Sequence, residues 1–232
     1  MIRVGKYNYK TKTAPVIEGY QNVIIHTQGD LSPYTMRDSK GRIMENWWQF
    51  HKIWQQVYKQ KQPISQFVKL DAAGELFCKD IRWEWKDQIH MDGDEPTDDY
   101  WEWRTAGLNH QKWVRYPNGF GHHKECKGSY YKGKLVGIVE ARRQIYFKKY
   151  REIAVATAQY KKLKEMLEKG INIQIVEVDG PDYLESYPYN KTVNGSLVMN
   201  EKRLRALIEN TNHAFGHGFA LAACLMEVDL TN

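Results

Sequence analysis

Large apolar side chains recur at helical spacing from residue 45 to about residue 61, beginning with a carboxylate at Glu45. In an α-helix most of these side chains would form one broad buried face. Pro63 follows, and residues before a proline tend to leave the helical conformation. The pattern therefore predicts a helix from Glu45 to about Lys61. Its apolar residues are Trp47, Trp48, Phe50, Ile53, Trp54, Val57 and Tyr58.

Two shorter apolar stretches precede this helix and predict strands. Residues 2–7 predict a short strand, and residues 21–27 are β-branched and flanked by turn residues, which is typical of a buried strand. Residues 31–34 then predict a loop, and residues 35–41 predict a polar turn that leads into the helix.

The second half of the chain changes between helical and strand periodicity. Gly170 ends a helical run, and Asp179-Gly180-Pro181 breaks the strand that follows it. A tyrosine-rich connection, residues 182–199, leads to a polar helix and then an apolar one. The pattern predicts helices at 136–153, 155–169, 200–210 and 219–228 and a strand at 171–178.

The middle of the chain, about residues 63–133, has the least clear periodicity. Residues 81–85 and 112–116 alternate like half-exposed strands, and residues 92–99 form an acidic loop between them. This loop lacks the full calcium-loop spacing, so a solvated loop is favoured over a cation site. We find no internal repeat and no low-complexity linker. The fold class is therefore α+β, a single helix-rich domain over residues 1–232 with a small sheet.

Composition and charge narrow the class of protein. The 232 residues are 42% hydrophobic and 27% charged, which is typical of a globular chain. The net charge of +6 favours polyanionic partners, and 13% aromatic residues interleaved with charges suit stacking on bases, although ordinary aromatic cores and solvated helix faces show the same features.

The cysteines and the N-terminus bear on localisation. Cys78, Cys126 and Cys224 are too far apart for a disulfide framework or a zinc site, which fits a reducing compartment. The N-terminus lacks an apolar signal core, and no stretch approaches the length of a membrane span. We expect a cytoplasmic protein without a membrane partner and with neither a metal nor an organic cofactor.

Three groups of residues are candidates for chemistry, and each has a structural alternative. Glu45 is either a catalytic carboxylate or an exposed acid in the first turn of a helix. Glu177 and Asp179 lie at the end of a predicted strand, where acids often face a ligand, and Asp179 has the alternative of forming a turn with Gly180 and Pro181. Gly216, His217 and Gly218 either cradle a phosphate or ribose at a helix N-terminus or let that helix pack tightly.

The region around Glu45 resembles a known family. The spacing of residues 45–52 resembles the signature helix of the NADAR (YbiA-like) family of N-glycosidases. In this chain the pattern is Glu45, one residue, the aromatic pair Trp47-Trp48, Gln49, two residues and Lys52. Residues 31–34 and 38–41 resemble the loop and the turn that precede that helix in the family.

Three later patches match the family in the same order. Residues 140–150 resemble its basic helix, 163–177 its helix, break and leucine-valine-glutamate strand, and 216–228 its closing glycine loop and helix. Relative to the family, residues 63–133 form an insertion. The chain also departs from the pattern where the family has an aspartate-tryptophan-glycine stretch, because Asp179-Gly180-Pro181 and a long connection stand there. This departure leaves the second acid and the substrate open.

The resemblance implies cleavage of a bond between ribose C1 and a base nitrogen. We expect removal of ADP-ribose from guanine in DNA, which would reverse the modification made by a DarT-type toxin. The protein would then act as an antitoxin or as a phage counter-measure against anti-phage defence. Two alternatives stay open: cleavage of ribosylamine intermediates of riboflavin biosynthesis, and non-catalytic binding of nucleic acid. The basic charge and the aromatic insertion favour the DNA substrate.

Roles for individual residues follow from the resemblance. Glu45 is the principal catalytic carboxylate, and Asp179 or Asp182 is the second acid. Lys52, seven residues after Glu45, orients Glu45 or contacts phosphate. The expected substrate-binding residues are Arg142 and Lys149 for the diphosphate, Trp47 and Trp48 as one core residue and one stacking wall, and Gly216, His217 and Gly218 as the cradle.

Overall fold

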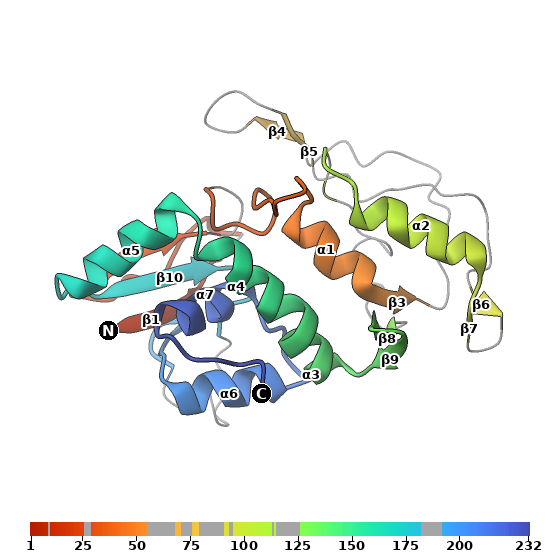
Figure 1. Cartoon of the computed structure of the whole chain (residues 1–232). Helices are drawn as coiled ribbons and strands as arrows, with labels where there is room; N and C mark the ends of the chain where they lie inside the picture. The colour runs from red at the N-terminus through yellow and green to blue at the C-terminus, as the bar shows by residue number, and fades with distance from the viewer. Residues whose placement is uncertain are drawn as a thin grey trace. The chain divides into compact units, whose positions relative to one another are not determined.

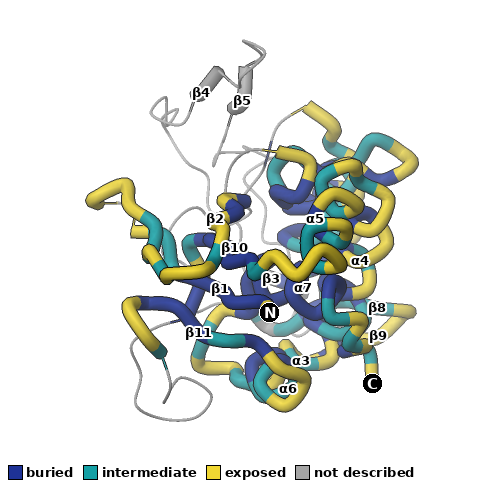
Figure 2. The backbone as a smooth tube through the Cα atoms, turned by 90° about the vertical axis from the view of Figure 1, so that its left-hand side faces the viewer, coloured by how far each residue is buried: buried dark blue, intermediate teal, exposed yellow. Residues whose placement is uncertain are grey.

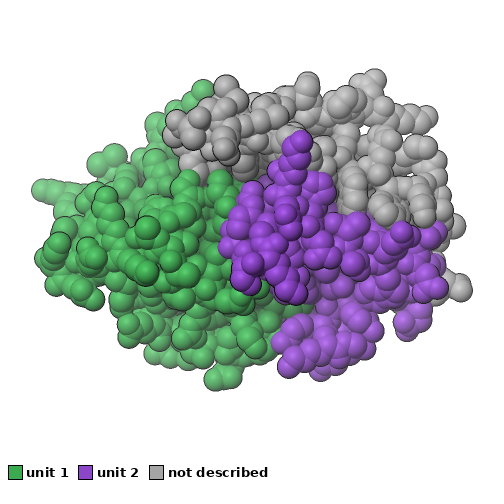
Figure 3. Space-filling model, turned by 45° about the horizontal axis from the view of Figure 1, so that its top comes forward, with its two compact units in different colours: residues 1–36, 142–232 green, residues 37–141 purple. Residues whose placement is uncertain are grey.

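The computed structural model describes residues 1–8, 10–25, 29–54, 68–70, 76–78, 91–92, 95–112, 114, 126–181 and 192–232. The chain divides into two compact units, which Figure 3 colours separately: residues 1–36 with 142–232 form unit 1, and residues 37–141 form unit 2. Both combine helices with small sheets, so the chain is of mixed α and β class. The assignment to one domain with an insertion at 63–133 stays a prediction.

The sheet of unit 1 has four strands in the order β11-β1-β10-β2. The central strand β10, Ile173–Glu177, runs parallel to β1, Ile2–Lys6, on one side and to β2, Gln21–Ile24, on the other. At the far edge, β11, Ser196–Val198, pairs antiparallel with β1. All five residues of β10 are buried. The strands predicted at 2–7 and 171–178 are confirmed.

The strand predicted at 21–27 differs from the expectation. It was expected to be buried, but β2 lies at the edge of the sheet, and Val23 is its buried residue. Ile24 is 49% exposed. The prediction of burial was wrong because β-branched composition does not distinguish an edge strand from a central one. The end of the predicted strand lies outside the described residues.

Helix α7, His217–Leu225, packs against β1 and β10, and all nine of its residues are buried. Helices α4, Lys148–Ala154, α5, Ala158–Glu168, and α6, Glu201–Glu209, pack around α7 (Figure 1). In Figure 2 the buried colour concentrates on β10 and α7, while α5 and α6 show exposed outer turns. The core of unit 1 therefore lies between the sheet and α7.

Local signals account for two of these helices. The side chains of Thr157 and Asn200 accept the backbone N–H groups of Tyr160 and Arg203 and so cap α5 and α6. Gly170 follows α5 with φ +78°, a conformation that favours glycine. The helices predicted at 155–169, 200–210 and 219–228 are confirmed within a few residues.

The helix predicted at 136–153 is also present, but its middle is π-helical. It comprises α3, Ile138–Ala141, a π-helical segment, Arg142–Phe147, and then α4. Periodicity at the α-helical spacing does not reveal a π-helical insertion. The segment is mostly buried, with Arg142 among its buried residues.

In unit 2 the aromatic helix is shorter than expected. Helix α1, Met44–His51, ends at Lys52, whose φ of −67° and ψ of 143° are extended. The chain continues as β3, Lys52–Trp54, which pairs antiparallel with β8, Cys126–Tyr131. The predicted helix to Lys61 was therefore wrong between residues 52 and 54, because pairing with a distant strand overrides the local pattern. Residues 55–61 lie outside the described part of the chain.

Helix α2, Asp98–Leu108, was not predicted from the sequence. The side chain of Thr97 caps it by accepting the backbone N–H of Tyr100, and Asp98 and Asp99 occupy its first turn. The last acidic residues of the expected loop at 92–99 are thus helical, where carboxylates favour the positive end of the helix dipole. The apolar residues of α2 do not follow a strong helical period, which explains why it was missed.

The core of unit 2 lies between α1 and α2. It comprises Phe50, Ile53, Tyr100 and Trp103, with the rings of Phe50 and Trp103 5.0 Å apart. Gly107 of α2 lets the helices approach closely, because a Cβ atom there would overlap the ring of Phe50.

The remaining strands of unit 2 are short. Strand β8 also pairs with β9, and two further antiparallel pairs are β4 with β5 and β6 with β7. The strand predicted at 81–85 and most of that at 112–116 lie outside the described residues. No helix within the described ranges is long and apolar enough to cross a membrane. The bounds of these strands are β4 Val68–Leu70, β5 Leu76–Cys78, β6 Met91–Asp92, β7 Glu95–Pro96 and β9 Lys134–Val136.

Candidate functional site

Glu45 is buried in the first turn of α1, with 8% of its surface exposed. The residue before the helix, Ile43, provides no side-chain cap, and the Glu45 carboxylate lies at the positive end of the helix dipole. The alternative reading of Glu45 as an exposed surface acid was therefore wrong. A buried carboxylate needs a compensating partner.

That partner is Gln49, one turn along the same face of α1. Its Nε2 donates to Oε1 of Glu45 at 2.7 Å, and Gln49 is itself 8% exposed. Its Oε1 in turn accepts a hydrogen bond from Nζ of Lys52 at 3.0 Å. Two hydrogen bonds thus connect Lys52 to Glu45 through Gln49. Lys52 can influence the orientation of Glu45 by this indirect connection.

The two tryptophans of α1 are both half-buried, so the expectation that one belongs to the core was wrong. Nζ of Lys52 lies 4.9 Å from the ring centroid of Trp48, which places Trp48 beside the chain from Glu45 to Lys52. The ring of Trp47 contacts the guanidinium of Arg42, at 4.4 Å, and the ring of His51, at 4.3 Å. The core position on α1 is filled by Phe50 instead.

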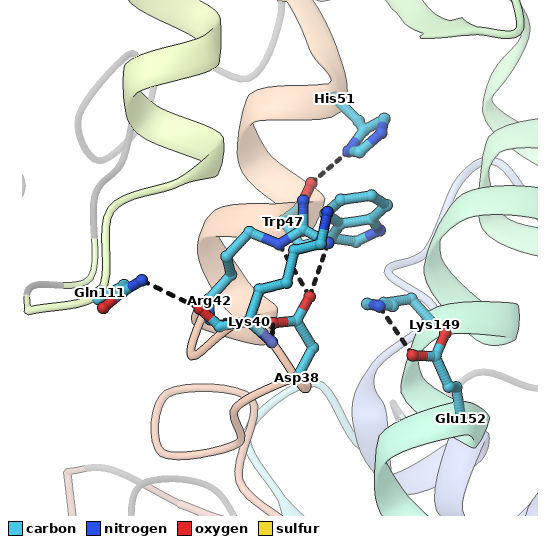
Figure 4. A network of polar contacts seen from close by, with 8 residues as sticks. All are labelled: Asp38, Lys40, Arg42, Trp47, His51, Gln111, Lys149 and Glu152. Carbon is cyan, nitrogen blue, oxygen red and sulfur yellow. Dashed lines mark hydrogen bonds and ion pairs between the residues drawn. The ribbon is translucent and has the colours of Figure 1, made fainter.

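A turn built on Asp38 leads into α1 (Figure 4). Oδ1 of Asp38 accepts the backbone N–H groups of Lys40 and Arg42, each at 3.0 Å, and Oδ2 forms an ion pair with Arg42 at 2.7 Å. Burial alone would raise the pKa of the Asp38 carboxyl, but these hydrogen bonds and the charge of Arg42 together lower it to about 2. The turn fixes Arg42 against Trp47 and so defines the start of α1.

In unit 1, Glu177 forms a second buried carboxylate site at the end of β10. Strand alternation turns its side chain to the α7 face of the sheet, where it is 0% exposed. Its Oε1 accepts the backbone N–H of Gly218 at 2.8 Å, and its Oε2 lies 3.0 Å from Nδ1 of His217. Nε2 of His217 lies 3.2 Å from the carbonyl oxygen of Ile25. Glu177 therefore caps the N-terminus of α7 from within the core.

This arrangement corrects the expectation for Gly216, His217 and Gly218. A Cβ atom at Gly216 or Gly218 would lie only 2.5 Å or 2.7 Å from Oε1 of Glu177. The loop was expected to cradle a phosphate or ribose, but the anion at this helix N-terminus is the carboxylate of Glu177. We therefore remove these three residues from the substrate-binding set.

Arg142 was expected to bind a diphosphate, and the structure gives it a different role. It is 5% exposed, and its guanidinium donates to the carbonyl oxygens of Ile208, Asn210 and His213 at 3.1, 2.7 and 2.5 Å. These carbonyls lie at the end of α6 and in the loop after it, where backbone oxygens lack helical partners. The donors assigned to the diphosphate are used inside the fold, so we withdraw that assignment.

The other predicted residues of unit 1 differ in exposure. Nζ of Lys149 forms an ion pair with Oε1 of Glu152 at 2.9 Å, and 11% of the Lys149 side chain is exposed (Figure 4). Asp179 is exposed in the turn that follows β10. Asp182 lies outside the described residues. The roles of Lys149 and Asp179 stay predictions.

Two thiols are described, and neither is suited to nucleophilic chemistry. Burial raises the pKa of Cys224 to about 12 and raises that of Cys126 as well. In the described ranges, no group of three or more His, Cys, Asp or Glu side chains could hold a metal ion. A shallow depression over the first turn of α6 is lined by Asn200, Glu201, Lys202 and Arg205, which are not predicted site residues.

Sequence reasoning did not assign a role to Gln49 or to Glu177. A signal existed for each: Gln49 follows Glu45 by four residues, which places both on one helix face, and Glu177 is the charged residue of an otherwise apolar strand end. Comparison with family models, curated proteins and solved structures finds no match for this chain.

Proposed function

We propose that this protein is an N-glycosidase that removes ADP-ribose from guanine bases in DNA. The observation that supports the proposal most is the environment of Glu45, a buried carboxylate at a helix N-terminus that is oriented by Gln49 and Lys52. Carboxylates held in this way, beside a flanking aromatic ring, are common at sites that stabilise developing positive charge.

The proposed reaction is a hydrolysis at ribose C1. The bond between C1 and the guanine nitrogen breaks, the oxygen of a water molecule bonds to C1, and one proton of that water is transferred to the leaving nitrogen. Positive charge develops on the ribosyl group, and the Glu45 carboxylate stabilises it. Asp179 or Asp182 is the proposed second acid, which orients the water. Glu177 is not proposed for this role because its carboxylate is fully buried and already bonded to Gly218 and His217.

Trp48 and Lys149 are the proposed contacts for the rest of the substrate. The ring of Trp48 is half-buried and lies beside Lys52, so it offers a face on which a base can stack. Lys149 is proposed to bind phosphate because residues 140–150 resemble the basic helix of the NADAR family.

The proposal includes membership of the NADAR family and its fold. The spacing from Glu45 through Gln49 to Lys52 in the sequence supports it, and so does the hydrogen-bonded chain that these three residues form.

The test is a release assay with defined DNA. Oligonucleotides ADP-ribosylated on guanine are incubated with the protein between pH 6 and 8, and free ADP-ribose and unmodified DNA are measured. Release with turnover is the expected result. No release at any of these pH values would reject the DNA activity.

Two further arms of the assay separate the alternatives. If the protein consumes a riboflavin-pathway ribosylamine and does not act on the DNA, its N-glycosidase activity would be assigned to the small-molecule substrate. Binding to DNA without turnover on either substrate would indicate a binding protein, and Glu45→Gln would then leave affinity unchanged.

A further inference from the structure

Gln49 makes the one hydrogen bond to the Glu45 carboxylate that the described residues provide, and this bond engages Oε1 at 2.7 Å. Both side chains are 8% exposed, so neither is freely solvated. A hydrogen bond to a carboxylate in such an environment is stronger than one at the surface. The contact therefore restricts the rotation of the Glu45 carboxylate.

Lys52 determines whether the NH2 group or the oxygen of the Gln49 side-chain amide faces Glu45. A lysine ammonium has donors and no acceptor, and its Nζ lies 3.0 Å from Oε1 of Gln49. Rotating the amide by half a turn would place its oxygen against the Glu45 carboxylate and its NH2 group against the ammonium. Both contacts would be repulsive, so Lys52 locks the amide with Nε2 toward Glu45.

Lys52 is itself held in place. Its ammonium lies over the ring of Trp48, and its backbone oxygen accepts the hydroxyl of Tyr100 at 3.0 Å. Tyr100 is 0% exposed in the core of unit 2. The chain of hydrogen bonds from Lys52 to Glu45 is thus anchored to a rigid part of the fold, which is what precise orientation of a catalytic group requires.

From these contacts we infer that Gln49 is a positioning residue, locked by Lys52, that holds Oε1 of Glu45 and leaves Oε2 to face the reacting centre. The inference rests on the proposed function. Because Gln49 is neutral, it orients the carboxylate without cancelling its charge, whereas a direct ion pair between Glu45 and Lys52 would weaken the field that stabilises a ribosyl cation.

Kinetics of variants test this role. Gln49→Leu removes the bond to Oε1, and we expect kcat to fall by about 10- to 100-fold with KM changed by less than about 3-fold, because orientation acts on the transition state. Lys52→Met should lower kcat in the wild-type background and have little further effect in Gln49→Leu. Gln111→Leu, at an exposed glutamine that bonds the Lys40 carbonyl, is the matched control and should leave kcat unchanged.

The pH dependence supplies a readout that a purely structural role would not move. Gln49→Glu places a second carboxylate against Glu45, which disfavours ionisation of the pair, so the acidic limb of the kcat/KM profile should move to higher pH by about one unit or more. Additive effects of Gln49→Leu and Lys52→Met, or an unshifted acidic limb in a folded Gln49→Glu variant, would overturn the inference.

A measurement without turnover keeps the two proposals separable. In ¹H–¹⁵N spectra the side-chain amide signals of Gln49 should shift in both Glu45→Gln and Lys52→Met. If the wild-type protein releases no ADP-ribose, the proposed function fails. The spectra then still test whether Gln49 is hydrogen-bonded to Glu45 and Lys52. Amide signals unchanged in both variants would reject the positioning role even in an active enzyme.

Discussion

The carboxylate of Glu177 lies where a side chain at Gly218 would have to be. Oε1 of Glu177 accepts the backbone N–H of Gly218 at 2.8 Å, and a Cβ atom on Gly218 would lie 2.7 Å from the same oxygen. A larger residue at this position would therefore force the Glu177 carboxylate or the first turn of α7 to move. The two residues are 41 positions apart in the chain, so the contact ties the end of β10 to the start of α7.

Gly218→Ala should lower the free energy of unfolding by about 2 kcal/mol, because overpacking a buried site forces neighbouring groups to move. The same change in a Glu177→Ala background should cost clearly less, since the clashing carboxylate is gone. Denaturant unfolding of the four proteins gives the coupling. Gly137→Ala is the control, at a glycine whose added Cβ meets no neighbour, and should cost at most about 1 kcal/mol. Equal costs of Gly218→Ala in both backgrounds would contradict the account.

Arg142 and Arg143 are adjacent in sequence but differ in role. Arg142→Met leaves three carbonyl oxygens without their donor and should lower the free energy of unfolding by about 3 kcal/mol. Arg143→Met removes a partly exposed ion pair with Glu209 and should cost less than about 1 kcal/mol. Thermal and denaturant unfolding measure both.

Measured substrate affinity distinguishes the structural role of Arg142 from the expectation that it binds the diphosphate. A folded Arg142→Met variant that keeps its stability but loses affinity for ADP-ribose would restore Arg142 to the phosphate-binding set. We expect the opposite pattern, in which stability falls and KM does not change.

Asp38 should make stability depend on pH in the acidic range. Its pKa is lowered to about 2 in the folded chain, below the unfolded value of 3.8, so the unfolded state takes up a proton first as the pH falls. The stabilisation, about 2 kcal/mol, is therefore complete above about pH 5 and is lost progressively as the pH falls toward 2.

Asp38→Asn isolates this charge, because the amide oxygen can still accept the N–H groups of Lys40 and Arg42. The difference in free energy of unfolding between wild type and Asp38→Asn should be constant from pH 7 to about 5 and should shrink below pH 4. Urea unfolding at several pH values measures it. A difference that stays the same at pH 3 would show that the ion pair with Arg42 is not its source.

The elements that the sequence predicted well are those with local signals. Thr157, Asn200 and Gly170 mark the ends of α5 and α6 within a few residues, and the apolar residues of β10 form an unambiguous strand. The end of α1 was not predictable in this way. Residues 52–54 continue the helical pattern, but they pair with β8, more than 70 residues later in the chain.

The candidate site shows the same division. Gln49 and Lys52 follow Glu45 by four and seven residues, about one and two turns of a helix. Sequence alone therefore places the three side chains close together. The roles of Arg142 and Gly218 depend on partners 66 to 71 and 41 residues away, respectively. Such contacts are set by packing, and a motif cannot show whether an arginine or a glycine loop faces a ligand or another part of the chain.

The central claim concerns Glu45. Glu45→Gln preserves the shape of the side chain and its hydrogen bond with Gln49 but removes the charge. We expect this variant to bind ADP-ribosylated guanine DNA with unchanged affinity and to keep its unfolding midpoint, because the replacement is nearly isosteric. Glu140→Gln, at a partly exposed carboxylate paired with Lys134, is the matched control.

Single-turnover release of ADP-ribose from this DNA is the most direct measurement. The account predicts that Glu45→Gln lowers the rate by at least about 100-fold, since the charge that stabilises the ribosyl cation is gone, while Glu140→Gln retains the wild-type rate. A Glu45→Gln protein that is folded, binds the substrate and releases ADP-ribose at the wild-type rate would contradict it.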